Sequence, residues 1–162
     1  MSSTESSSAA VYRLPTRPVD AKLILSNGKQ QEVTLFLATV TEPRRAPESL
    51  DEFLNGSRRF IPVESKTNGK RQLVNLDSLQ RVEVGDDAPI LSRTDANSAP
   101  CVDLIRIEMM DDVVLEGTLA SILPPERRRT SDFFNMTEMF IPLEVEDGVT
   151  YVNKRYIAKV WL

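Results

Sequence analysis

Short stretches of this chain alternate apolar and polar residues, a pattern typical of β-strands that bury one face. Residues 22–26 alternate in this way, with Leu23 and Leu25 on one side. Asn27-Gly28 follows, and because both residues tolerate positive φ, this dipeptide predicts a hairpin turn. Residues 32–40 are rich in β-branched and apolar residues, which favours a second strand.

The same alternation continues along the rest of the chain. A polar stretch with prolines leads into a Phe-x-Asn segment that could form one helical turn, with Ser49 or Ser131 as its cap. Turns at Asn68-Gly69 and Asp147-Gly148 separate later strands. Gly117 lies inside an expected strand, where a glycine weakens pairing but permits a sharp bend, as at a barrel corner. The further expected strands are residues 60–64, 72–74, 79–84, 102–109, 113–122, 140–145, 150–152 and 157–162.

Two parts of the chain resemble each other, which indicates an internal repeat. Residues 51–64 and 131–144 share six of 14 positions, namely Phe, Asn, Phe, Ile, Pro and Glu in the same order. The flanking segments continue the match, since 37–40 lies over 119–122 and Val74-Asn75 lies over Val152-Asn153. In the last strands, Leu79, Val82 and Val84 lie over Ile157, Val160 and Leu162.

We therefore expect an all-β protein of two repeated five-stranded small barrels, because closure removes exposed strand edges. The second strands, 33–40 and 113–122, carry apolar residues on both faces, so we expect them at a seam where the two units pack as a pseudo-dimer. The expected organisation is a disordered tail (1–20), a first repeat (21–84), a linker (85–101) and a second repeat (102–162).

The composition excludes several kinds of chemistry. With no histidine and one cysteine, the chain cannot hold a Ser-His-Asp triad, a histidine metal ligand, an internal disulfide or a thiolate zinc site. We expect no enzymatic activity, cofactor or metal, and we expect Cys101 to be a small buried residue. No stretch approaches the roughly 18 apolar residues of a membrane span. The lack of a secretory signal and the lone cysteine predict a cytoplasmic protein.

Each unit resembles the small barrels of Sm-like and SH3-like proteins. Sm-like proteins carry an Asp and, four residues later, an Asn before a short apolar strand, and Asp51 and Asn55 have that spacing. Asp132 and Asn135 are one residue closer, and residues 152–160 match the second Sm motif in apolar spacing. The Arg-Gly pair that the Sm family places beside an RNA base is absent, so the resemblance implies architecture and not RNA binding.

Basic and aromatic residues are the candidates for partner binding. Guanidinium groups can hold phosphate or acidic groups bidentately, although arginines in loops are commonly just solvated. The two aromatic candidates could anchor a partner or fill the core. The candidates are Arg44, Arg45, Arg58, Arg59, Arg127, Arg128, Arg129, Tyr156 and Trp161.

Residues shared by both halves have a structural and a functional interpretation. Pro62 and Pro142 suit a position where no ladder N–H is needed, or they mark an edge left open to a partner strand. The matching asparagines either bond the backbone in turns or bind a ligand. These asparagines are Asn55, Asn75, Asn135 and Asn153.

Charge is divided unevenly between the two halves. Residues 21–84 carry a net charge of +2 and residues 102–162 carry −4, within a total of −4. Opposite charges favour packing of the two units, or head-to-tail association between chains. We expect a non-enzymatic interaction module, an adaptor or assembly component that binds a protein partner through duplicated surfaces. The alternative is nucleic-acid or nucleotide binding through the arginine-rich loops, which the negative total disfavours.

Overall fold

The structure, a computed structural model, describes residues 15–41, 46–89, 101–121 and 130–161. The described residues contain ten antiparallel strands, two short α-helices and two 3-10 turns. The helices are α2 (Leu50–Asn55) and α3 (Thr130–Phe134), and the turns are η1 (Leu76–Ser78) and η4 (Lys154–Tyr156). The strands are β1 (Thr16–Leu25), β2 (Gln30–Ala38), β3 (Phe60–Ser65), β4 (Arg71–Asn75), β5 (Leu79–Val84), β6 (Cys101–Met109), β7 (Val114–Ser121), β8 (Phe140–Val145), β9 (Gly148–Asn153) and β10 (Ile157–Trp161).

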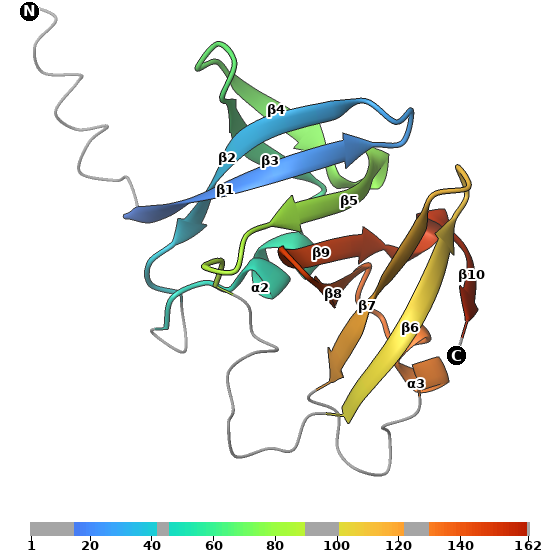
Figure 1. The fold of residues 1–162 in the computed structure, drawn as a ribbon. Helices are drawn as coiled ribbons and strands as arrows, with labels where there is room; N and C mark the ends of the chain where they lie inside the picture. Colours follow the sequence, from blue (N-terminus) through green and yellow to red (C-terminus); the bar gives the residue numbers. More distant parts are fainter. Residues whose placement is uncertain (1–14, 42–45, 90–100, 122–129, 162) are drawn as a thin grey trace, which may run out of the picture.

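All ten strands belong to one sheet, which confirms the all-β prediction. Their order is β10-β6-β7-β8-β9-β5-β1-β2-β3-β4, so strands of the first half occupy one end and strands of the second half the other (Figure 1). The sheet does not close, and β4 and β10 form its two ends. Barrel closure was expected to remove every edge, and this strand order instead leaves two.

The two halves of the sheet meet where β5 pairs with β9, in the register Arg81↔Val152 to Val84↔Val149. The expectation that the second strands would form this seam is wrong, because β2 lies between β1 and β3 and β7 lies between β6 and β8. From Val33 onward every second residue of β2 is buried, and the residues between them are partly exposed. The apolar residues on one face of β2 are therefore buried, whereas the residues on its other face are only partly buried.

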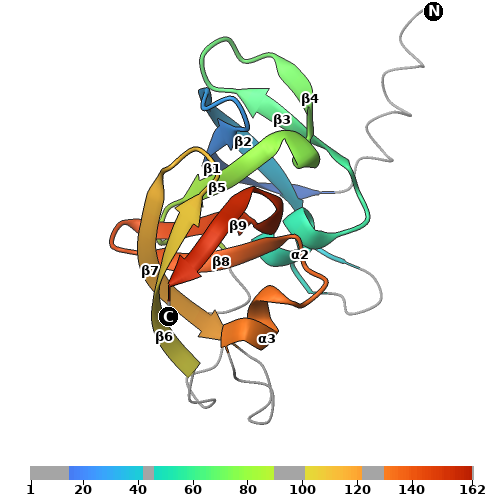
Figure 2. The same ribbon diagram turned by 90° about the vertical axis from the view of Figure 1, so that its right-hand side faces the viewer.

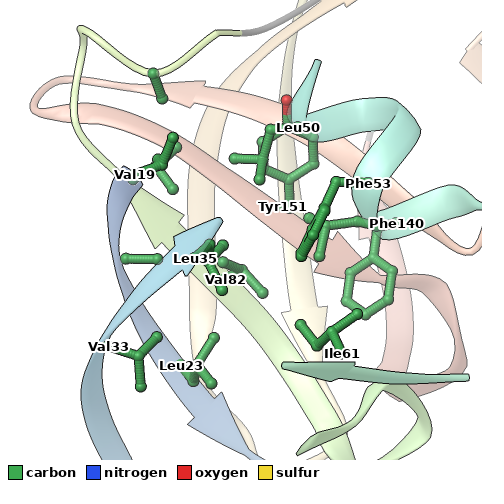
Figure 3. Packing of buried hydrophobic residues seen from close by; sticks show 14 of the residues in the cluster. Val19, Leu23, Val33, Leu35, Leu50, Phe53, Ile61, Val82, Phe140 and Tyr151 are labelled. Carbon is green, nitrogen blue, oxygen red and sulfur yellow. The ribbon is translucent and has the colours of Figure 1, made fainter. Parts of the chain in front are cut away.

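The larger hydrophobic core contains residues of both halves. Phe140, Val149 and Tyr151 come from β8 and β9, yet they belong to the cluster built by the first half. Figure 3 shows Tyr151 and Phe140 beside Phe53 and Leu50 of α2. A second cluster lies entirely within the other half and contains Ile105, Ile107, Met109, Leu119, Ile141, Leu143 and Val152.

The end of the expected tail differs from the sequence-based expectation. Strand β1 begins at Thr16, inside the expected tail 1–20, because residues 16–20 pair with β2 and Val19 is buried. Strand β5 pairs with β1 only from Ala21 onward. Residues 16–20 therefore have one unpaired side, where a strand tolerates Pro18. Residues 1–14 and most of the expected linker, 90–100, lie outside the described residues.

The helix caps are confirmed in one half and wrong in the other. Ser49 caps α2, accepting a hydrogen bond from the Glu52 backbone N–H at 3.2 Å. Ser131 is no cap, because α3 already begins at Thr130. Gly28, at φ 85°, confirms the hairpin predicted from Asn27-Gly28.

Gly117 and the two shared prolines are explained by strand packing. A Cβ at Gly117 would lie 2.4 Å from the Glu144 carbonyl oxygen, so glycine is needed for the close approach of β7 to β8. Figure 2 shows β7 as a strongly curved strand. Pairing of β2 with β3 stops at Val63 and pairing of β7 with β8 stops at Leu143. Pro62 and Pro142 are therefore the first residues beyond those ladders, where proline removes no ladder bond.

Candidate functional site: the seam and the two open edges

Of the seven arginines that are candidates for partner binding, the structure describes two. Arg44, Arg45, Arg127, Arg128 and Arg129 lie outside the described residues. Arg58 forms an ion pair with Glu48 at 3.3 Å and stacks over the Phe53 ring at 4.9 Å. Arg59 pairs with Asp77 at 3.2 Å. Both arginines are exposed and each has a carboxylate partner within its own half.

The two aromatic candidates have different surroundings. Tyr156 is partly buried, and its hydroxyl donates a hydrogen bond to the Asp77 carbonyl oxygen, which links η4 to η1 across the two halves. Trp161 lies in β10 and is 53% exposed. Tyr156 therefore belongs to the contact between the halves, and only Trp161 is available on an open edge. Cys101 begins β6, and its side chain lies outside the described residues.

The seam between β5 and β9 is densely packed. Every residue of β9 is buried, and the Tyr151 hydroxyl donates to an Asp51 carboxylate oxygen at 2.8 Å. Asn153 is fully buried and its Nδ2 donates to the Leu79 carbonyl oxygen at 2.9 Å. At Gly148 (φ 153°), a Cβ would lie 2.1 Å from the Val84 carbonyl oxygen. The seam thus requires glycine, a tyrosine and an asparagine at fixed positions.

Asn55 of α2 fastens the first half to β8. Its Nδ2 donates to the Phe140 carbonyl oxygen at 2.9 Å, and its Oδ1 accepts from the Phe140 N–H at 2.8 Å. One side-chain amide therefore binds both backbone groups of Phe140, as a neighbouring strand would. Phe140 lies two residues before Pro142, just where the β7–β8 ladder has ended.

A polar network continues the seam toward the β6–β7 turn. Gln80 is buried, and its Nε2 donates to an Asp111 carboxylate oxygen at 2.9 Å. This bond from Gln80 lowers the pKa of Asp111 below its usual value. Arg81 is also buried and donates to Gln80 Oε1 at 3.0 Å.

Strand β4 forms the outer edge of the first half and corresponds to β9 of the second half, but one side of β4 has no neighbouring strand. In β4, Arg71, Gln72 and Leu73 are all exposed, Leu73 to 70%. Phe60 in the neighbouring β3 is 52% exposed. Asn75 Oδ1 accepts from the Asp77 N–H at 3.0 Å, just as Asn153 accepts from Arg155. Asn75 and Asn153 thus confirm the interpretation that these residues bond the backbone in turns.

The outer edge of the second half is formed by β10 and α3. No residue of α3 is buried, and β10 is exposed or partly exposed along its length. A groove of about 380 Å³ lies between them, lined in part by Phe134, Ile157 and Val160. Lys154 lies at the same groove, and burial lowers the pKa of its amine.

Other kinds of site find no support within the described ranges. They hold no cluster of three metal-ligating side chains. None of the helices among these residues has the length and hydrophobicity to cross a membrane.

Sequence reasoning missed the roles of Asn55, Tyr151 and Gly148 at the seam. The sequence does single out Asn55, but nothing local shows that its amide binds Phe140, 85 residues away. The chain matches no protein-family model, no curated protein and no solved structure.

Proposed function

We propose that this protein is a non-enzymatic protein-interaction module, an adaptor or assembly component, built from two copies of one small-barrel unit. The proposal is supported by one observation above all: the ten-stranded sheet ends in β4 and β10, and each of these strands is paired on one side only. The open side of an edge strand presents a row of backbone N–H and C=O groups to which another chain can add a strand.

Exposed apolar side chains accompany both edges. Leu73 lies in the edge strand β4, Phe60 lies in the neighbouring β3, and Trp161 lies in the edge strand β10. Large exposed apolar residues beside an open strand supply the side-chain contacts that give strand addition its specificity. Two such edges on one chain allow it to bridge two partners, or to hold one partner twice.

The alternative, nucleic-acid binding through arginines, draws no support from the described residues. Arg58 and Arg59 are each engaged with a carboxylate, and the net charge of −4 opposes general affinity for phosphate backbones.

Affinity capture from the source cells tests the proposal, with the full chain as bait. Leu73→Asp is the test variant, because it places a charge on the open edge. Leu104→Asp is the matched control, since Leu104 is equally apolar and 77% exposed but lies in β6, which is paired on both sides. The proposal predicts a stoichiometric protein partner that wild type and the control retain and Leu73→Asp loses. Loss from both variants, or from neither, contradicts it.

A further inference from the structure

The two open edges are the same two surfaces that already meet inside the molecule. Within each half the strand order is the same, β5-β1-β2-β3-β4 and β10-β6-β7-β8-β9. Strand β9 therefore occupies the place of β4, and β10 occupies the place of β5. The internal seam joins β9 to β5, which leaves one β4-type edge and one β5-type edge unused.

We propose that a second copy of this chain docks head to tail, its β4 edge pairing with β10 as β9 pairs with β5. This inference uses the edges of the proposed function and names a copy of the chain as their occupant. The seam fixes the register. Val82, three residues after Leu79, pairs with Tyr151, two residues before Asn153. The counterparts of Leu79 and Asn153 are Ile157 and Asn75, and the same distances from these lead to Val160 and Leu73. The contact between copies thus pairs Val160 with Leu73.

The side chains that such a contact needs are present on the β4 side. Phe140 and Tyr151 are fully buried at the seam, and their counterparts Phe60 and Leu73 are 52% and 70% exposed. Asn75 has the turn conformation of Asn153, so its amide can donate to the Ile157 carbonyl oxygen of the neighbouring copy. This bond would match the one between Asn153 and Leu79.

The receiving surface is present on the β10 side. In the first half, Leu54, Leu79 and Val82 are almost fully buried in the cluster that includes Phe140 and Tyr151. Their counterparts Phe134, Ile157 and Val160 line the open groove beside α3. This groove therefore corresponds to the site that Phe140 and Tyr151 fill, and Phe60 and Leu73 of another copy are its proposed occupants.

Asn135 lies at the β10 edge where Asn55 lies at the internal seam. Its counterpart Asn55 binds both backbone groups of Phe140. Asn135 is exposed, and its Nδ2 is turned back to the Ser131 carbonyl oxygen at 2.7 Å. A side-chain rotation would bring this amide to the backbone of Phe60 in a neighbouring copy.

Charge and symmetry also favour this mode. The half that offers β4 carries +2 and the half that offers β10 carries −4, so long-range attraction between the opposite net charges of the halves favours a head-to-tail encounter. A heterologous contact leaves one edge open on every added copy, and it therefore builds a closed ring or an open chain. Leu73 lacks the hydroxyl that Tyr151 donates to Asp51. We therefore expect the contact between copies to be weaker than the internal seam and to depend on concentration.

Two variants, each defective at one edge, test the proposal. The β4-edge variant combines Phe60→Ser with Leu73→Asp. The β10-edge variant combines Asn135→Asp, which cannot donate to a carbonyl oxygen, with Ala158→Pro. Ala158 is exposed and falls at the bulge where β10 skips a residue against β6, and Ile157 has φ −85° and ψ 125°, which the residue before a proline adopts readily.

Light scattering over a concentration series measures the mass of the particles that each protein forms. Wild type is expected to exceed the 18.2 kDa of one chain and to grow with concentration. Each variant alone is expected to stay monomeric, and a mixture of the two to form a one-to-one complex through the remaining good edges. Circular dichroism confirms that both variants fold. The proposal is overturned if wild type stays monomeric at high concentration, if either variant still dimerises alone, or if the mixed variants form no complex. A monomeric wild type that still captures another protein would leave the proposed function standing.

Discussion

Strands β9 and β4, and likewise β5 and β10, hold the same place in the strand order of their own halves, yet the strands at the seam are buried far more than those at the open edges. All six residues of β9 are buried, whereas three of the five in β4 are exposed. Four residues of β5 in a row are buried, but none of β10 is. Helix α2 buries three residues and α3 none. Burial in this fold therefore follows from whether a neighbouring unit is present, and not from the strand itself.

The largest contrast is expected at Tyr151 and Leu73. Tyr151→Ala removes a fully buried ring from the seam core and is expected to cost about 4 kcal/mol of unfolding free energy. Leu73→Ala removes an exposed side chain and is expected to change stability by less than about 0.5 kcal/mol. Urea denaturation at low protein concentration measures both. Equal losses would remove the distinction between seam and edge.

The turn glycines of the two hairpins give the next contrast. Gly148→Ala forces a Cβ against the Val84 carbonyl oxygen and is expected to cost about 3 kcal/mol. Gly69 ends the equivalent turn with φ 69° and open space around it, so Gly69→Ala is expected to cost only about 1 kcal/mol, for the left-handed backbone. Thermal unfolding of the two variants compares them directly. A costlier Gly69→Ala would contradict the close contact at the seam.

The two helix asparagines form a third matched pair. Asn55→Asp replaces the donor to the Phe140 carbonyl oxygen with a carboxylate, and we expect a loss of about 2 kcal/mol. Asn135→Asp, which loses only a bond within its own exposed helix turn, is expected to cost less than about 0.5 kcal/mol in the monomer. If the two variants are equally stable by chemical denaturation, Asn55 does not fasten the halves together.

The smallest expected effect is a pH dependence at Asp111. The bond from Gln80 lowers the folded-state pKa of Asp111 below the unfolded value of 3.8. Its contribution to stability is therefore fully present above pH 3.8 and is lost as the pH falls through the folded pKa. Because this carboxylate is exposed and screened, we expect less than about 0.5 kcal/mol.

The melting temperature of wild type and of Asp111→Asn, followed from about pH 6 to pH 3, tests this effect. The variant should lose less stability over that range than wild type does. A variant with an identical or steeper pH dependence would show that Asp111 contributes nothing at the seam.

The strands could be predicted from the sequence because their signals are local. Alternation, β-branched residues and turn glycines place nine of the ten strands to within two residues at either end, and Ser49 marks the start of α2. The prediction that Ser131 caps the second helix was wrong, because α3 already begins at Thr130. The early start of β1 was missed because pairing with β2 outweighs the prolines around it.

The site could not be predicted from the sequence, because its contacts join distant residues. The β5–β9 register pairs residues about 70 positions apart, and no local pattern states which strand edges meet. Apolar residues on both faces of the second strands pointed to the wrong seam. Asn55 and Asn135 match in sequence, yet one binds across the seam and the other folds back on its own helix.

Cross-linking between copies tests the central claim most directly. In a Cys101→Ser background, which removes the native cysteine, Leu73→Cys and Val160→Cys are made in separate chains and mixed under mild oxidation. Residues directly opposite in an antiparallel pair have Cα atoms about 4.5 to 5.5 Å apart, which is within the Cα separation of disulfides. We expect the mixture to form a disulfide-linked dimer of the two chains faster than Leu73→Cys mixed with the exposed control Leu104→Cys. Equal cross-linking of both mixtures, or none in either, would contradict the head-to-tail pairing of β4 with β10.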